Sequence, residues 1–95
     1  MKCYGVFTFA HDPTLIRVGQ TVKSIFQLYF TNKRFDNDNN VIIDKIFLDF
    51  ECWDSAAEFV VNNCILGDKI YIEASPKNDV DGVIFRINTF KVFHV

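Results

Sequence analysis

Alternation of apolar and polar side chains predicts a protein built almost entirely of β-strands. Residues 5–10 (Gly-Val-Phe-Thr-Phe-Ala) are rich in aromatic and β-branched side chains, and they stop at the turn-forming sequence His11-Asp12-Pro13. A connector then ends at Gly19-Gln20, and residues 22–32 alternate between two faces. We therefore predict two strands in this part of the chain, the second of them long.

The next segment predicts a hairpin arm and a third strand. Residues 33–40 are too polar and turn-prone to continue the second strand, so we expect a flexible arm that exposes Phe35. Residues 41–53 form the third strand, with a regular alternation from Ile46 onward. One face of this strand is apolar. The other face combines aromatic and acidic side chains: Phe47, Asp49, Glu51 and Trp53.

One short helix is expected after the third strand. Ser55 and Glu58 have the spacing of a capping box, in which Ser55 is the N-cap residue and Glu58 bonds back to it. Gly67 is suited to end the helix, because glycine readily adopts the left-handed conformation of a helix C-terminus.

The remaining elements complete a recognisable topology. Residues 69–74 alternate again, residues 79–82 predict a turn, and residues 83–95 close the chain as a strand. Three strands, one helix and two strands are the order of an OB-fold, a five-stranded Greek-key barrel, whereas an immunoglobulin-like sandwich needs more strands and no helix. We predict an all-β chain with one OB-fold domain over residues 1–95.

Composition and charge restrict the functional classes. The chain has 11 Phe, 3 Tyr and 1 Trp, more aromatic side chains than a domain of this size can bury. Some of them are therefore expected at the surface or at a subunit contact. The formal net charge of −2 provides no overall positive field for an anionic partner.

Cysteine spacing and hydropathy indicate the compartment. Three cysteines without a Cys-x-x-Cys pair predict buried thiols in a reducing cytoplasm rather than a zinc site or a disulfide scaffold. No apolar run approaches the roughly 20 residues that a membrane span needs, so we expect a cytoplasmic protein without a membrane partner.

The sequence carries no recognisable catalytic pattern. We find no serine, histidine and aspartate order, no phosphate-binding glycine loop and no metal-ligand spacing, so we expect neither an enzyme nor a cofactor nor a metal. Asp49 and Glu51 are two residues apart on an open strand without a pocket, which predicts a solvated face. His11 and His94 have no ligand-spaced partners and are expected to be structural.

Several short sequences resemble the bacterial-type single-stranded DNA-binding protein (SSB) family. The first half resembles the family's D-P-x-L, glycine and F-x-L-A-x-N-R-x signature through Asp12-Pro13, Leu15, Gly19, Phe26, Leu28 and residues 32–35 (Asn-Lys-Arg-Phe). The second half has residues 52–58 (Cys-Trp-Asp-Ser-Ala-Ala-Glu), eight further residues, and residues 67–74 (Gly-Asp-Lys-Ile-Tyr-Ile-Glu-Ala). This half resembles A-W-G-K-x-A-E, eight residues, and K-G-x-x-V-x-V-E-G without a gap. The primosomal protein N group, which shares the fold and the short length, is a related possibility.

The resemblance implies single-stranded DNA binding without sequence preference, in replication, recombination or repair at the nucleoid. Each base stacked on an aromatic ring contributes about 1 to 3 kcal/mol, and Phe47 and Trp53 lie on the face of their strand that does not enter the core. The expected nucleic-acid-binding residues are the stacking aromatics Trp53, Phe47 and Phe35 and the basic residues Lys33, Arg34, Arg17 and Lys77.

Other observations favour different roles. Asp49 and Glu51 lie between the two stacking residues, where carboxylates repel phosphate, and the loop of residues 75–82 has Lys77 as its one basic residue. Trp53 can instead seal the corner between strand and helix, and Phe47 can pack at a subunit interface. The alternative function is therefore a protein-interaction or assembly module of the same fold.

The resemblance also leads to expectations about assembly. We expect a homodimer or homotetramer, because joined barrels would bury the surplus of phenylalanine. The sequence ends at Val95 within a predicted strand, so we expect no acidic C-terminal tail of the kind through which SSB proteins recruit partner enzymes.

Overall fold

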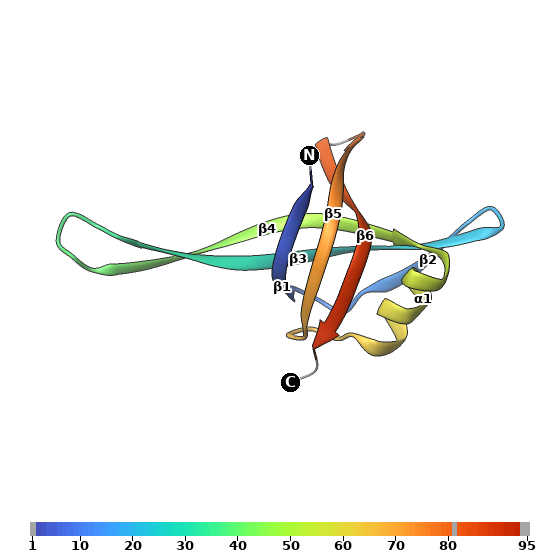
Figure 1. The fold of residues 1–95 in the computed structure, drawn as a ribbon, viewed down its shortest axis with the longest axis horizontal. Helices are drawn as coiled ribbons and strands as arrows, with labels where there is room; N and C mark the ends of the chain where they lie inside the picture. Colours follow the sequence, from blue (N-terminus) through green and yellow to red (C-terminus); the bar gives the residue numbers. More distant parts are fainter. Residues whose placement is uncertain (1, 81, 94–95) are drawn as a thin grey trace.

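The computed structural model describes residues 2–80 and 82–93, which form six β-strands and one helix (Figure 1). The strands before the helix are β1 (Cys3–Phe9), β2 (Thr14–Val18), β3 (Thr21–Phe35) and β4 (Val41–Trp53). The helix α1 (Asp54–Asn63) precedes β5 (Lys69–Asp79) and β6 (Gly82–Phe93). The predictions at Asp81, His94 and Val95 lie outside the described residues.

Five of these strands close into a barrel, which confirms the predicted OB-fold. The sheet order is β1-β5-β6-β4-β3-β2, and β1 also pairs with β3 at Thr8↔Tyr29 and Phe9↔Leu28, which closes the sheet. Neighbouring strands are antiparallel except β4 and β6, which pair in parallel at Phe50↔Phe85. Among the described residues, the strand β2 pairs only with β3 and extends one edge of the sheet.

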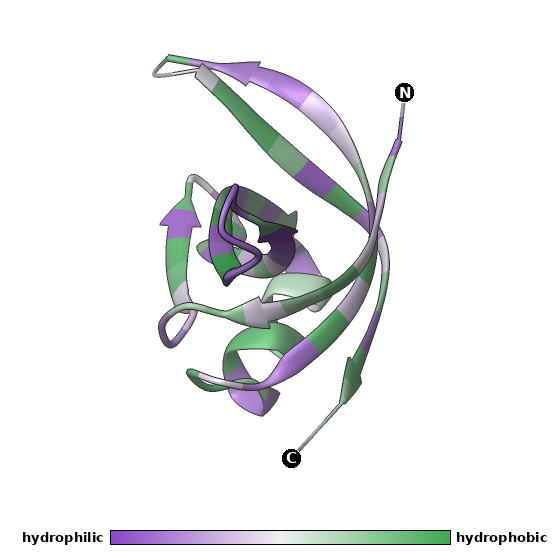
Figure 2. Cartoon of the chain, turned by 90° about the vertical axis from the view of Figure 1, so that its left-hand side faces the viewer, coloured by the Kyte–Doolittle hydropathy of each residue, from purple (hydrophilic) through white to green (hydrophobic). Residues whose placement is uncertain are grey.

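Phenylalanine forms much of the barrel core. Hydrophobic and hydrophilic residues alternate along the strands in Figure 2, as expected where one face of each strand is buried. The rings of Phe7 and Phe50 lie 5.3 Å apart, and those of Phe9 and Phe26 lie 5.1 Å apart. The buried hydrophobic core comprises Phe7, Phe9, Phe26, Leu28, Phe50, Cys52, Ala57, Val60, Cys64, Ile70, Ile72 and Ala74. Burial is thus confirmed for Cys52 and Cys64, whereas Cys3 is partly exposed.

The predicted connector after the first strand contains the strand β2. Its five residues pair antiparallel with the beginning of β3, from Thr14↔Ile25 to Val18↔Thr21. All five side chains are exposed, so the segment lacks the alternation from which a strand is predicted.

His11 is structural as expected, because its Nε2 accepts a hydrogen bond from the Gln27 N–H at 3.2 Å.

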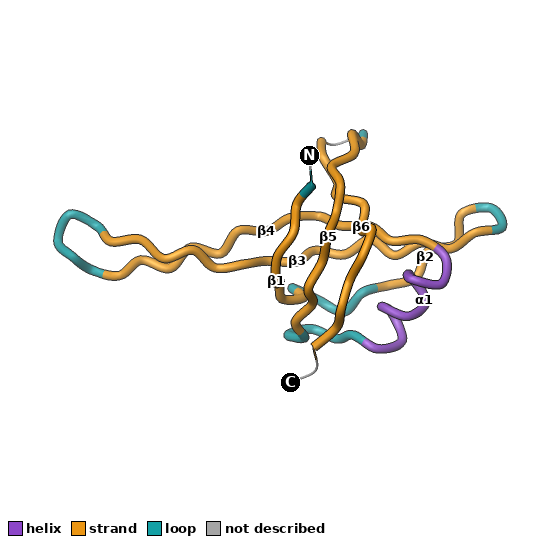
Figure 3. Tube along the Cα trace, in the orientation of Figure 1, coloured by secondary structure: helices purple, strands orange, loops and turns teal. Residues whose placement is uncertain are grey.

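The hairpin arm is longer and more regular than predicted. The strands β3 and β4 stay paired as far as Phe35↔Val41, and the arm projects from the barrel with a short loop at its tip (Figure 3). In that loop, Oδ1 of Asp36 accepts hydrogen bonds from the Asp38 and Asn40 N–H groups, both at 2.9 Å. The hydrogen bond from the backbone of Asn40 is the main reason why the pKa of Asp36 lies below its ordinary value.

The helix begins and ends earlier than predicted. It starts at Asp54 directly after β4, with Trp53 as N-cap residue and no side-chain capping bond, so the proposed capping box of Ser55 and Glu58 is wrong. Continuity with β4 sets this start, because the strand runs into the helix without a loop. The helix ends at Asn63 rather than near Gly67, which has a φ of +91° and lies in the following turn.

Candidate functional site

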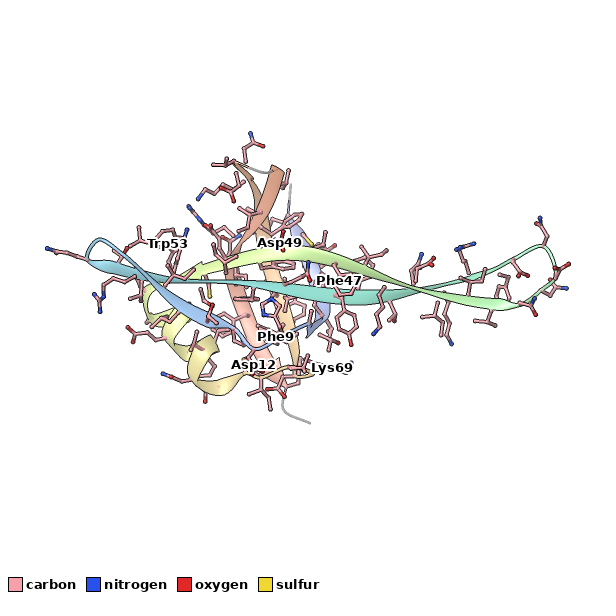
Figure 4. The ribbon with its side chains drawn as sticks, turned by 180° about the vertical axis from the view of Figure 1, so that it is seen from behind. Phe9, Asp12, Phe47, Asp49, Trp53 and Lys69 are labelled. Atoms are coloured by element: carbon pink, nitrogen blue, oxygen red, sulfur yellow. The ribbon has the colours of Figure 1, made fainter. Side chains whose placement is uncertain are left out.

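One face of the β3–β4 ribbon turns away from the barrel core, and we call it the outer face. It consists of cross-strand pairs in a single row: Lys23↔Trp53, Ile25↔Glu51, Gln27↔Asp49 and Tyr29↔Phe47. The predicted stacking residues Phe47 and Trp53 both lie on this face, on the same strand as Asp49 (Figure 4). They are six residues apart, which corresponds to about 20 Å along an extended strand.

At one end of the outer face, five side chains form a compact group that we call the Glu51 cluster: Lys23, Glu51, Trp53, Lys77 and Arg86. Oε2 of Glu51 accepts hydrogen bonds from Nε1 of Trp53 at 2.9 Å, Nε of Arg86 at 3.0 Å and Nζ of Lys77 at 3.4 Å. The ammonium group of Lys23 lies 5.3 Å from the centroid of the Trp53 ring, a cation–π distance. The cluster therefore joins β3, β4, β5 and β6.

Glu51 corrects the prediction of a solvated acidic face. It is only 2% exposed, because side chains from β5 and β6 cover it. Burial raises the pKa of its carboxyl, but hydrogen bonds from Trp53 and Arg86, together with the charge and hydrogen bond of Lys77, lower the pKa below its ordinary value. The residue is thus an ionised carboxylate that is neutralised by two cations, and it does not present a bare negative charge to a ligand.

A second group, the Phe47 cluster of Tyr29, Lys45 and Phe47, lies toward the arm. The rings of Tyr29 and Phe47 are 5.6 Å apart with an interplanar angle of 48°, and Nζ of Lys45 is 4.8 Å from the centroid of the Tyr29 ring. Phe47 remains 47% exposed. An exposed ring beside a cation is the combination that binds stacked bases and their phosphates.

Between the two clusters the outer face is acidic. Asp49 is exposed, as predicted, and it lines a shallow hollow with Ile25 and with Asp79, Gly82, Val83 and Ile84 of the β5–β6 hairpin. Two carboxylates at one hollow oppose the approach of a phosphate. The acidic character expected from Asp49 and Glu51 therefore belongs to Asp49 and Asp79.

The two predicted basic residues of the arm, Lys33 and Arg34, lie on opposite faces of the β3–β4 ribbon. Lys33 has the same strand parity as Tyr29 and lies opposite Ile43, whereas Arg34 has the opposite parity. The Nε of Arg34 donates a hydrogen bond to Oδ2 of Asp44 at 2.9 Å, and the two side chains are 57% and 43% exposed. Phe35, near the tip, is 70% exposed.

Of the last two predicted residues, Lys77 belongs to the Glu51 cluster, but Arg17 does not. Arg17 is an exposed residue of β2 opposite Val22, so it shares the face of Val22 rather than the outer face that carries Lys23. Sequence reasoning missed Lys23, Tyr29, Lys45 and Arg86. The register of a β3–β4 hairpin with its turn at residues 36–40 would have placed Lys23 opposite Trp53, but no local pattern indicates the contact of Arg86 with Glu51.

The described part of the chain contains neither a metal-ligand cluster nor a membrane-spanning helix. Within residues 2–80 and 82–93, no three histidine, cysteine, aspartate or glutamate side chains are grouped so as to hold a metal ion. In the same residues, no helix is both long and apolar enough to cross a membrane.

The fold matches solved structures of single-stranded DNA-binding proteins. A small protein of this kind from Streptomyces coelicolor has a TM-score of 0.80 at 14% identity, with 98% of this chain and 92% of that chain covered. The second such protein of Mycobacterium smegmatis, SSBb, has a TM-score of 0.76 at 15% identity, with 96% and 86% covered.

PriB from Ralstonia solanacearum shares the fold as well, with a TM-score of 0.74 at 8% identity and coverage of 98% of this chain and 97% of that chain. No protein-family model and no curated protein sequence matches the chain. At these identities the comparisons show the fold, which is the one that the SSB resemblance implied.

Proposed function

We propose that this OB-fold binds single-stranded DNA without sequence preference along the outer face of β3 and β4, in replication, recombination or repair at the nucleoid. The observation that carries the proposal is the row of exposed or partly exposed aromatic side chains beside cations, from Trp53 with Lys23 to Phe47 and Tyr29 with Lys45. Stacking on such rings tolerates any base, and the neighbouring cations offset phosphate charge.

The proposed path of the strand follows the charges on this face. It contacts the Glu51 cluster, passes the hollow of Asp49 and Asp79, and meets the Phe47 cluster before it reaches Lys33 and Phe35 on the arm. Arg17, which is paired with Val22 on the opposite face from Lys23, adds positive charge at the edge of this path rather than a contact on the outer face. Arg34 also contributes, although its ion pair with Asp44 reduces the charge that it offers to a phosphate.

The direct test is a titration of the protein with oligo(dT) at low salt. Because Trp53 is the only tryptophan of the chain, its fluorescence reports on the outer face alone. We expect quenching that saturates together with the anisotropy of a labelled oligo(dT), and binding that weakens as salt rises. Unchanged fluorescence together with free tumbling of the oligonucleotide would reject the proposal.

Asp49 distinguishes DNA binding from the alternative role as a protein-interaction module, which its exposed carboxylate favours. Glu51 cannot serve this purpose, because a lysine there would be buried beside Lys77 and Arg86. If the outer face binds DNA, Asp49→Lys is expected to tighten oligo(dT) binding by about three- to tenfold at low salt, since it replaces a repelling charge by an attracting one. Asp49→Asn is the intermediate control. If the wild-type protein binds oligo(dT) negligibly and only the lysine variant binds it strongly, the result would favour the interaction module.

We also propose that the chain assembles as a homodimer, or as a homotetramer built from such dimers, through the free edge of β1. This strand lies at the end of the sheet order and pairs with β3 only at Thr8 and Phe9 among the described residues. Beside that edge is an apolar hollow lined by Cys3, Tyr4, Gly5, Val6, Phe7, Phe30 and Leu48. A second copy of the same edge would pair with it antiparallel about a twofold axis.

A charge placed at the β1 edge tests this assembly. Val6 is 53% exposed beside the hollow, so Val6→Glu is expected to leave the barrel folded but convert the oligomer to a monomer in analytical ultracentrifugation. The matched control is Val83→Glu. Val83 is 55% exposed on β6 and lies outside the apolar hollow beside β1, so this variant should keep the wild-type mass. A wild-type protein that sediments as a monomer at all concentrations would contradict the proposal.

A further inference from the structure

The outer face contains one charged side chain that the proposed function does not explain, the carboxylate of Glu51. Its side chain is 3% exposed, and it lies on the face where phosphates are expected. Burial of a carboxylate is costly unless hydrogen bonds and cations compensate for the lost water. The hydrogen-bond donors to this carboxylate, on Trp53, Lys77 and Arg86, all belong to the candidate interface.

We propose that Trp53, Lys77 and Arg86 form a subsite for one nucleotide unit of the bound strand, and that Glu51 is the positioning residue that assembles it. The base lies against the indole ring of Trp53, and an adjacent phosphate lies on Lys77 and Arg86. This inference rests on the proposed function, and it adds which residues bind a phosphate next to the stacked base.

The geometry around Glu51 holds the three groups in fixed relation. A single oxygen, Oε2, receives all three donors at distances between 2.9 and 3.4 Å. The bond to Nε1 fixes the plane of the indole ring. The other two bonds tie side chains of β5 and β6 to β4, so the stacking surface and the two cations are arranged before the ligand arrives. Such preorganisation reduces the entropy that binding costs.

Lys77 and Arg86 keep donors for a ligand. Arg86 uses Nε for Glu51, whereas a guanidinium has five N–H donors, so its terminal Nη groups can bond a phosphate oxygen. An ammonium group has three donors, and the bond to Glu51 uses one of those of Lys77. The side chains of Lys77 and Arg86 are 43% and 47% exposed, so a ligand can reach both of them.

The charges of the Glu51 cluster also favour an anion. Lys23, Lys77 and Arg86 supply three positive charges and Glu51 supplies one negative charge, which leaves an excess of two positive charges. The neighbouring hollow has two carboxylates, those of Asp49 and Asp79. A phosphate is therefore favoured beside Trp53 and disfavoured over the hollow.

Arg86→Gln tests the phosphate contact. The probe is a labelled oligo(dT) of about 16 nucleotides, the upper end of the range of OB-fold site sizes. We expect affinity to fall about five- to tenfold at low salt, and the slope of log K against log[salt] to decrease by about 0.7, the value of one phosphate contact in a single strand. The control is Lys91→Gln, an exposed lysine of β6 that lies opposite Tyr71 of β5, belongs to neither the Glu51 cluster nor the Phe47 cluster, and should change neither quantity.

Glu51→Gln tests the positioning role through the sign of its effect. The substitution removes a negative charge from the interface, so a simple field effect would tighten binding. Loss of positioning predicts the opposite, about three- to fivefold weaker binding, because glutamine keeps an acceptor for Trp53 but no charge to hold Lys77 and Arg86. Glu51→Gln is also made in a protein that already carries Arg86→Gln. There its effect on log K is expected to be less than half as large, because one of the residues that Glu51 positions is already missing.

The outcomes separate this inference from the proposed function. If the wild-type protein binds oligo(dT) and Arg86→Gln leaves both the affinity and the salt slope unchanged, the subsite is overturned but the proposal of DNA binding is not. Tighter binding by Glu51→Gln would overturn the positioning role. Absence of binding by the wild-type protein would overturn the subsite and the proposed function together. Circular dichroism of each variant shows that the barrel has folded, so these outcomes refer to binding.

Discussion

Trp53→Ala is expected to weaken oligo(dT) binding by about tenfold to a hundredfold, measured by anisotropy of the labelled oligonucleotide. One base stacked on an aromatic ring contributes about 1 to 3 kcal/mol, and 1.4 kcal/mol corresponds to a factor of ten in affinity. The hydrogen bond to Glu51 holds the indole in place, and the ammonium group of Lys23, 5.3 Å from the ring centroid, supplies a positive charge beside it. The substitution also removes one donor from Glu51, which disturbs the Glu51 cluster further.

The conservative control is Trp53→Phe, which keeps an aromatic surface but loses the hydrogen bond to Glu51. We expect it to bind within about fivefold of the wild-type protein, between the wild type and the alanine variant. If phenylalanine and alanine at this position weaken binding equally, the hydrogen bond to Glu51 rather than stacking determines the role of Trp53. If neither weakens it, Trp53 only seals the corner between β4 and α1, which is the structural role that its N-cap position allows.

Local sequence patterns were sufficient to predict the barrel and the outward positions of Phe47 and Trp53. Alternation in β4 places Phe50 and Cys52 inside and Phe47 and Trp53 outside, and the structure has them there. Such patterns work because side chains of a strand alternate between faces whatever the strand pairs with. They fail for β2, whose five exposed residues show no contrast between two faces.

Glu51 shows why the alternation of side chains along β4 could not predict which charged groups of the outer face are exposed. Its parity places it outside, as Asp49 is, yet it is buried because Lys77 and Arg86 reach over it from β5 and β6. These contacts join residues 26 and 35 positions apart in the chain, so they depend on how the barrel closes. A net charge of −2 accordingly says little about this surface, where acidic and basic groups are segregated over a few residues.

The residues that carry the resemblance to SSB proteins lie in different parts of the structure. Oδ1 of Asp12, in the Asp12-Pro13 motif, accepts a hydrogen bond from the Leu66 N–H at 2.7 Å and joins the loop after β1 to the loop before β5. The N–H of Gly67 donates to the Phe9 carbonyl at 3.0 Å in the same region. These motif residues join two loops of the barrel, whereas Trp53 lies on the candidate interface.

Phe50→Ala is expected to be the most destabilising of the substitutions considered, with a loss of about 3 to 5 kcal/mol in the free energy of unfolding. Phe50 is fully buried, and its ring contacts Phe7 at 5.3 Å and Phe85 at 5.5 Å between ring centroids. A chain of this size has a total stability of about 5 to 14 kcal/mol, so the loss removes at least about a fifth of it. At about 4 to 8 °C per kcal/mol, the melting temperature is expected to fall by at least about 12 °C.

The matched control is Phe59→Ala, which removes the same atoms from a helical side chain that is 47% exposed and touches Phe90 at 5.7 Å. Its expected loss is about 1 kcal/mol or less. Melting curves of both variants should be recorded at one protein concentration, because assembly through the β1 edge would make the melting temperature depend on concentration. Equal destabilisation by the two substitutions would contradict a core centred on Phe50. A large loss for Phe50→Ala alone would place it in the packing that holds β4 against β1 and β6, on which the outward positions of Phe47 and Trp53 depend.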